Sequence, residues 1–107
     1  MKHGKRILLL IPILISLLFA GTIPEVTGAN AAVAPAASGT ARWVQVVGNK
    51  TNTSDIRVSY GVTATATNGI PVVPGGGMML PPQGQEYSLA YVSVYIASGD
   101  KVSFVWN

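Results

Sequence analysis

Residues 55–67 read DIRVSYGVTATAT, and this stretch has the clearest periodicity in the chain. Apolar and polar or small side chains alternate here in six consecutive pairs, a pattern typical of a β-strand with one buried and one exposed face. Asn68 and Gly69 follow at once, and this dipeptide favours the two positive-φ positions of a type I′ turn. We therefore predict a β-hairpin whose return strand, 70–73, lies at a sheet edge, because Pro71 cannot donate to a strand ladder.

Three further segments on either side of this hairpin are strand candidates. Residues 40–48, 86–97 and 101–107 are rich in β-branched and aromatic side chains, which favour pleated surfaces. Neither a helical period nor an internal repeat is present after residue 31. These observations predict an all-β fold, a small antiparallel β-sandwich or partly open barrel of about five strands.

The N-terminal residues have the parts of an export signal. Three basic residues lie within 1–6, an apolar run covers 7–20, and Ala29-Asn30-Ala31 has the small-x-small pattern of a cleavage site. We predict a signal peptide, 1–31, that is cleaved to give a secreted, extracellular protein. The alternative is a retained membrane anchor. Against it, the apolar run of 14 residues would rise about 21 Å as a helix, and the hydrocarbon core is roughly 30 Å thick.

Cleavage after Ala31 would leave 76 residues, without cysteine and without the single histidine, His3. Residues 32–40 are small and uncharged, and we expect a flexible N-terminal arm. The alternative is an extended segment that pairs with the sheet edge of a neighbouring molecule. Residues 41–107 would then form one β-domain, which without a disulfide depends on dense packing or on assembly with other chains.

The composition after residue 31 excludes several kinds of chemistry. Nucleophilic systems that need His or Cys are absent, as are the imidazole and thiolate ligands of zinc and copper sites. A carboxylate pair or a calcium site would have to use Asp55, Glu86 and Asp100, which adjoin turns or begin a strand. We expect no enzyme, no metal site and no cofactor. The net charge after residue 31, four basic against three acidic side chains, is too small for nucleic-acid binding.

Two groups of side chains are candidates for recognition. Tyr87, Tyr91 and Tyr95 are spaced by four residues, so one continuous strand would place them on the same face about 13 Å apart. Such a row suits a sugar or a protein interface, and the alternative is internal packing. Met78-Met79-Leu80 lies between Gly- and Pro-rich segments. We expect an adaptable apolar loop that contacts a partner or a membrane, or else closes one end of the domain.

Two weaker patterns remain. The alternation of Ala and Thr in 61–67 is also found in membrane-spanning β-hairpins, although an ordinary sheet with one solvated face has the same pattern. Asn49 and Asn52 each begin a glycosylation acceptor triplet, and the sequence does not decide whether either is used.

We therefore expect a secreted, non-enzymatic β-protein that acts by surface binding or self-assembly. Its partner would be itself, a surface protein or a polysaccharide, and membrane contact is not favoured. The alternatives are a membrane-active toxin resembling a bacteriocin and, third, a small inhibitor that presents a loop framed by prolines.

Overall fold

Residues 21–107, which a computed structural model describes, form β-strands and a single 3-10 turn, so the all-β prediction is confirmed. The basic and apolar parts of the predicted export signal lie outside the described residues. The elements are β1 (Gly21–Thr27), β2 (Ala31–Val33), β3 (Thr40–Ala41), β4 (Val44–Gly48), β5 (Ile56–Tyr60), β6 (Ile70–Val72), β7 (Gly77–Leu80), β8 (Tyr87–Ser88), η1 (Leu89–Tyr91), β9 (Val92–Ile96) and β10 (Lys101–Trp106).

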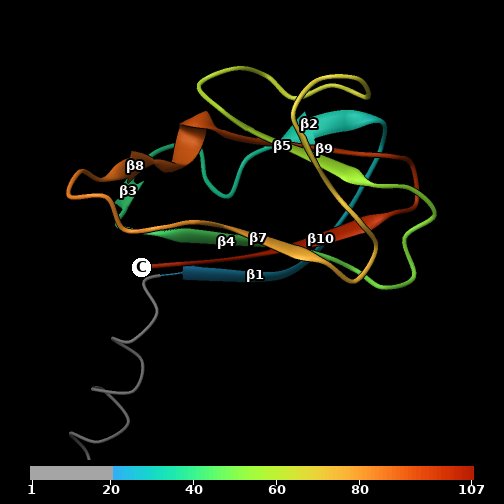
Figure 1. Cartoon of the computed structure of the whole chain (residues 1–107), viewed down its shortest axis with the longest axis horizontal. Helices are drawn as coiled ribbons and strands as arrows, with labels where there is room; N and C mark the ends of the chain where they lie inside the picture. Colours follow the sequence, from blue (N-terminus) through green and yellow to red (C-terminus); the bar gives the residue numbers. More distant parts are fainter. Residues whose placement is uncertain (1–20) are drawn as a thin grey trace, which may run out of the picture.

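Two four-stranded antiparallel sheets form two layers (Figure 1). Sheet A has the order β1-β10-β4-β7, and sheet B has the order β2-β9-β5-β6. Strands β3 and β8 pair as a small third sheet at one end of the layers. Within residues 21–107, the first strand, β1, therefore pairs with the last, β10, and β1 and β2 belong to different sheets.

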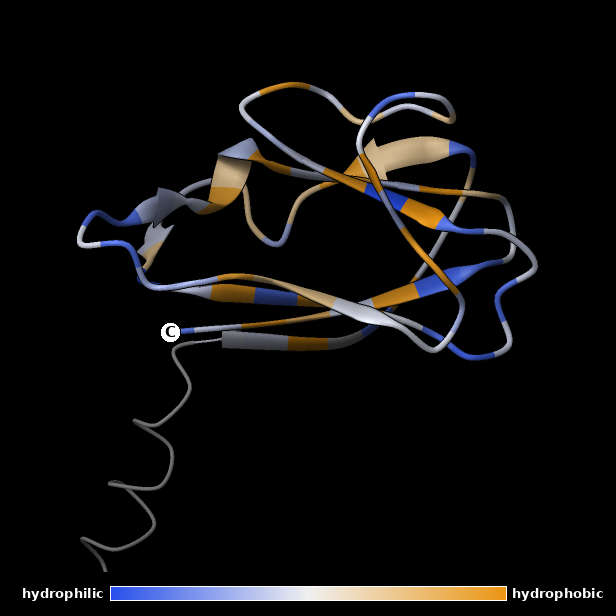
Figure 2. Cartoon of the chain, in the orientation of Figure 1, coloured by the Kyte–Doolittle hydropathy of each residue, from blue (hydrophilic) through white to orange (hydrophobic). Residues whose placement is uncertain are grey.

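The core lies between the two layers and is formed by buried apolar residues of both sheets. Hydrophobic and hydrophilic positions alternate along several of the strands (Figure 2). Val46 and Phe104 from sheet A and Ile56, Val94 and Ile96 from sheet B have no exposed surface. Full burial of one such side chain stabilises the folded state by about 1.5–3 kcal/mol. The residues that alternate with them along the strands, such as Gln45, Tyr95 and Ser103, are half-exposed.

The predicted hairpin at Asn68-Gly69 is wrong in its turn and its length. β5 and β6 pair through Val58↔Ile70 and Ile56↔Val72, so residues 61–69 leave the ladder as a loop. Gly69 has the expected positive φ of 110°, but Asn68 does not have one, and a type I′ turn needs both. The reason lies at Gly61, where a φ of 80° turns the chain out of β5.

Three other predictions differ from the observed elements. The described residues have ten short strands where about five were expected, because turns divide two of the predicted strands and β1, β2 and β7 form outside them. The 86–97 strand is interrupted by η1. Residues 78–80, expected in a loop, form most of β7 and pair with β4.

The N-terminal part of the described chain is paired within the molecule. β1 and the first residue of β2 fall inside the predicted signal peptide, 1–31. Residues 32–40, predicted as a flexible arm, include most of β2 and the start of β3. Both ends of this segment are therefore already hydrogen-bonded to strands of the same chain, β9 and β8.

Candidate functional site

The three tyrosines predicted to share a strand face do not form one row. Tyr87 lies in β8 with 6% exposure, and Tyr91 at the end of η1 has 60% exposure. Tyr95 is half-buried and points to the outer side of β9, between the buried Val94 and Ile96. The row fails because β8 pairs in the third sheet whereas β9 belongs to sheet B, so the chain must turn between them.

Tyr60, a residue that the sequence analysis did not select, joins two of these tyrosines. Its ring meets the rings of Tyr87 and Tyr91 edge-on, with centroid separations of 5.4 and 6.1 Å, an arrangement favourable for aromatic pairs. The Tyr60 hydroxyl oxygen accepts a hydrogen bond from the backbone N–H of Ser88 at 2.8 Å. The Tyr87 hydroxyl donates to the carbonyl of Pro81 at 2.7 Å. Tyr60, held by Ser88 and Tyr87, is thus the aromatic neighbour of the exposed Tyr91 ring.

The loop formed by residues 61–69 lies across the outer face of β9. The backbone N–H of Gly61 donates to the carbonyl of Tyr91, and that of Ala64 donates to Oγ of Ser93, both at 2.9 Å. Ala64 is only 2% exposed. Ser93 points away from the core, because its neighbours along the strand are buried. The Ala- and Thr-rich segment thus covers part of sheet B instead of extending as a hairpin.

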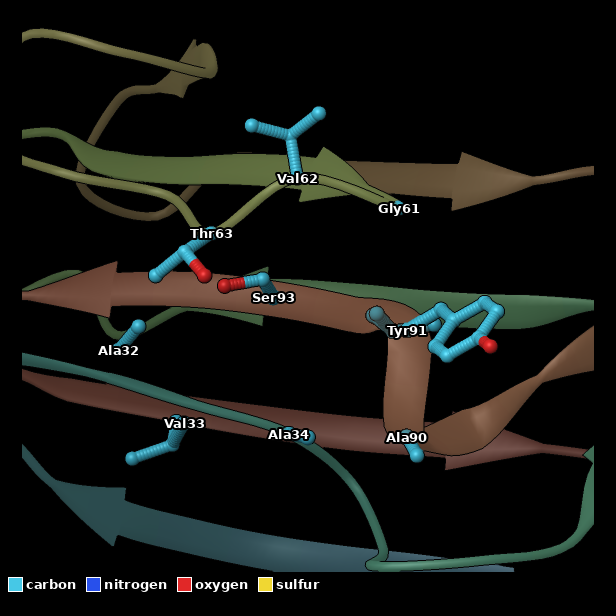
Figure 3. A pocket seen from close by; sticks show the side chains of 10 residues that line it. Ala32, Val33, Ala34, Gly61, Val62, Thr63, Ala90, Tyr91 and Ser93 are labelled. Atoms are coloured by element: carbon cyan, nitrogen blue, oxygen red, sulfur yellow. The ribbon is translucent and has the colours of Figure 1, made fainter.

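A groove of about 330 Å³ separates the start of the 61–69 loop from the segment that contains β2 (Figure 3). Its volume is at the lower end of the range for small-molecule sites, about 300–1,000 Å³. The lining residues come from three segments distant in the sequence: Ala32, Val33, Ala34, Gly61, Val62, Thr63, Ala90, Tyr91, Val92 and Ser93.

The groove offers apolar surface and hydroxyl groups but no charge. None of its ten lining residues is Asp, Glu, His, Lys or Arg. The hydroxyl groups of Thr63 and Ser93 lie beside each other on its wall, and the Tyr91 ring stands at one end (Figure 3). Val62 is 60% exposed. Such a surface suits a neutral ligand that combines an apolar face with hydroxyl groups.

The three residues of the Met78-Met79-Leu80 segment lie outside this groove. Met78 and Leu80 are half-buried and pack against the core, whereas Met79 is 48% exposed on the outer side of sheet A. The segment is an edge strand that helps to close the core. Only one of its three side chains is available to a partner.

The carboxylates of the described residues have mainly structural contacts. Asp100, 3% exposed, accepts the backbone N–H groups of Thr53 at 2.9 Å and Ser54 at 3.1 Å, and both hydroxyls at 3.0 and 3.1 Å. The Thr53 N–H, more than any other contact, holds the pKa of Asp100 below its usual value, and burial opposes this effect. Glu25 forms an ion pair with Lys101 at 3.1 Å.

The remaining acidic groups form no recognisable metal centre. Glu86 accepts a hydrogen bond from the hydroxyl of Thr40, and Asp55 lies exposed immediately before β5. Across residues 21–107 there is no group of three or more His, Cys, Asp or Glu side chains placed to hold a metal ion.

The two glycosylation triplets differ in accessibility. Asn52 is 8% exposed, and its Nδ2, the atom that would carry a glycan, donates to the carbonyl of Lys101 at 2.9 Å. A glycan on Asn52 is incompatible with this arrangement. Asn49 is half-buried, with Nδ2 3.3 Å from Oε2 of Glu25.

The chain matches no protein-family model, no curated protein and no solved structure. In the part of the chain that the structure describes, no helix has the length and apolar character needed to cross a membrane.

Proposed function

We propose that this protein is an exported, non-enzymatic binding module, a small two-layer β-sandwich that takes a neutral, hydroxyl-rich ligand such as a surface polysaccharide. The observation that carries the proposal is the uncharged groove on sheet B, lined by Tyr91, Thr63 and Ser93.

A sugar ring has an apolar face and a rim of hydroxyl groups, and the groove has a counterpart for each. The exposed ring of Tyr91 supplies a flat apolar surface with a polar tip. Its side chain has no hydrogen-bond partner within residues 21–107, so the phenol group is free to bond a ligand. Thr63 adds a hydroxyl group that can donate and accept, and Ser93, whose oxygen already accepts from Ala64, adds a hydroxyl donor. The absence of charge in the lining favours a neutral ligand over a charged one.

Binding is favoured over the other expectations for structural reasons. Assembly through a free N-terminal arm loses support, because Ala32 and Thr40, near the two ends of that arm, pair within the chain. Catalysis by a pair of carboxylates also loses support. Three of the four carboxylates in residues 21–107, those of Glu25, Glu86 and Asp100, are engaged in internal contacts. The membrane-active alternative depended on a long hairpin, and residues 61–69 form a loop over sheet B instead.

Binding to an array of neutral oligosaccharides, with a sulfated polysaccharide as the charged comparison, tests the proposal. We expect binding to a neutral glycan that changes little with salt, because no charged lining residue contributes. Tyr91→Ala should weaken that binding about tenfold or more, which corresponds to about 1.4 kcal/mol.

Tyr95→Ala is the matched control. It removes a tyrosine ring from β9, which follows η1, without altering the lining of the groove. It should leave glycan affinity unchanged. Failure to bind any neutral glycan, or equal losses in the two variants, would overturn the assignment.

A further inference from the structure

We infer that the export leader ends before Gly21, so that the mature protein begins with strand β1 and not with Ala32. This inference rests on the proposed export of the protein. Its basis is the place that residues 21–31 occupy in the folded domain.

The first observation is the pairing of β1 along the whole of β10. Partners run from Gly21↔Trp106 to Thr27↔Lys101, with one irregularity between Ile23 and Val26. Pro24 lies at this irregularity. Proline lacks a backbone N–H and is tolerated in an edge strand. β1 is therefore a full member of sheet A, and not an extended tail that touches it.

β1 also contributes side chains to the packing of the domain. Ile23 and Val26 are half-buried against the core, and the carboxylate of Glu25 pairs with Lys101. At the start of the strand, Gly21 lies under the indole of Trp106 so closely that a Cβ atom there would be 2.1 Å from the ring. The Trp106 side chain is thus packed over the first residue of β1.

The connection from β1 to β2 is built around the turn between β9 and β10. Gly28 donates to the carbonyl of Asp100 at 2.7 Å and accepts from Gly99 at 3.2 Å. Asn30, the only non-glycine residue of the described chain with positive φ (57°), accepts from the N–H of Ser98 through Oδ1 at 2.9 Å. The backbone N–H of Asn30 donates to the carbonyl of Ile96 at 3.1 Å. Such specific hydrogen bonds are not expected of a segment that is cleaved off and discarded.

Cleavage after Ala31 would remove all of these contacts from the mature protein. The N–H and C=O groups of β10 that face β1 would form an open edge, which favours pairing with other chains. β2 would lose its first residue, which pairs with Ile96. The core would lose the cover of Ile23 and Val26.

The sequence before Gly21 is compatible with an earlier cut. Ala20 and Gly21 are both small, and a leader of 20 residues lies within the usual range of about 15–30. The cut after Ala31 has the better small-x-small pattern, because the residue two positions before Ala20 is Leu18. The structural cost of losing β1 outweighs this difference in pattern.

The test is mass spectrometry of the N-terminus after expression of the full chain in a bacterium with a Sec export system. Two variants place a charged residue directly before each candidate bond: Ala20→Arg before Gly21, and Ala31→Arg before Ala32. Ala31 is exposed on an edge strand, so the second change is tolerated by the fold. We expect a mature N-terminus at Gly21 in the wild type and in Ala31→Arg, and loss of that product in Ala20→Arg.

The outcomes separate this inference from the proposed function. A mature N-terminus at Ala32 that is abolished by Ala31→Arg would overturn the position of the cut while leaving export intact. An intact Met1 that stays with the cells would overturn both.

Discussion

Asn52 and Lys101 exchange two hydrogen bonds. The backbone N–H of Lys101 donates to Oδ1 of Asn52 at 2.7 Å, and Nδ2 of Asn52 donates to the carbonyl of Lys101 at 2.9 Å. A side-chain amide therefore takes the place of a strand neighbour at the start of β10. This pair anchors the polar loop before β5 to sheet A.

The first prediction concerns this pair. Asn52→Ala should lower the free energy of unfolding by about 1–3 kcal/mol, because it removes the side-chain partner of the part-buried Lys101 N–H and a donor to the Lys101 carbonyl, which keeps the N–H of Asn49. Asn49→Ala removes an equivalent side chain whose hydrogen bonds, to Thr51 and to Glu25, are all exposed, and it should cost less than about 1 kcal/mol. Urea denaturation measures both. Equal losses of unfolding free energy in the two variants would contradict the stabilising role given to the Asn52–Lys101 pair.

The second prediction is a dependence of stability on pH. Because the pKa of Asp100 is lowered in the folded state, its contribution is fully present above the unfolded value of about 3.9 and is lost as the pH falls through the lower folded value. Asp100→Asn should be less stable than the wild type at neutral pH, and its stability should fall less between about pH 6 and pH 3.

Asp55→Asn is the control for this measurement, because Asp55 is exposed. It should retain the acid sensitivity of the wild type. A variant at Asp100 that lost stability in acid as steeply as the wild type would contradict the role given to its carboxylate.

The third prediction concerns close packing in the connection between β1 and β2. A Cβ atom at Gly28 would lie 2.3 Å from the carbonyl oxygen of Ala97, whereas at Gly77 the nearest atom would be 3.5 Å away. Neither glycine has a positive φ. Gly28→Ala should therefore destabilise the protein by about 1–3 kcal/mol, as overpacking does, and Gly77→Ala by less than about 1 kcal/mol.

Thermal unfolding of the two glycine variants provides the comparison. A neutral Gly28→Ala would mean that the 28–30 connection is not held in place as the structure has it. It would also weaken the inference that β1 belongs to the mature protein.

The fourth prediction separates the two tyrosines that contact Tyr60. Tyr87→Ser should cost about 3–5 kcal/mol, since it truncates a ring that is 6% exposed. Tyr91→Ser should cost about 1 kcal/mol, the value of one edge-to-face contact, because the ring is 60% exposed. Calorimetry measures the loss of stability in both variants. A loss in Tyr91→Ser as large as that in Tyr87→Ser would contradict a surface role for Tyr91.

Several features of the fold were accessible from local patterns. Residue type and periodicity are local properties, so the predicted strands at 40–48, 55–67 and 101–107 each contain a strand that the structure has, β4, β5 and β10. Gly69 was expected to need positive φ, and it has one. In contrast, the alternation of Ala and Thr after Gly61 had the same period but did not form a strand, because small side chains offer little to bury and the glycine redirects the chain.

The candidate site could be predicted only in part. Tyr91 was selected for its spacing from two other tyrosines, yet its neighbours in space are Tyr60 and the start of the 61–69 loop. No spacing rule brings Ala32, Thr63 and Ser93 to one groove. Their proximity follows from the order of strands in sheet B and from a loop that folds back over it.

The sequence by itself determined the all-β class and the absence of thiol chemistry, because residue types and periodicity act locally. Tertiary structure alone decided that β1 pairs with β10, that Asp100 and Asn52 hold the loop before β5, and that an uncharged groove forms beside Tyr91. These features depend on contacts between segments far apart in the chain. Such contacts form only where the two sheets, packed around a shared core, bring those segments together.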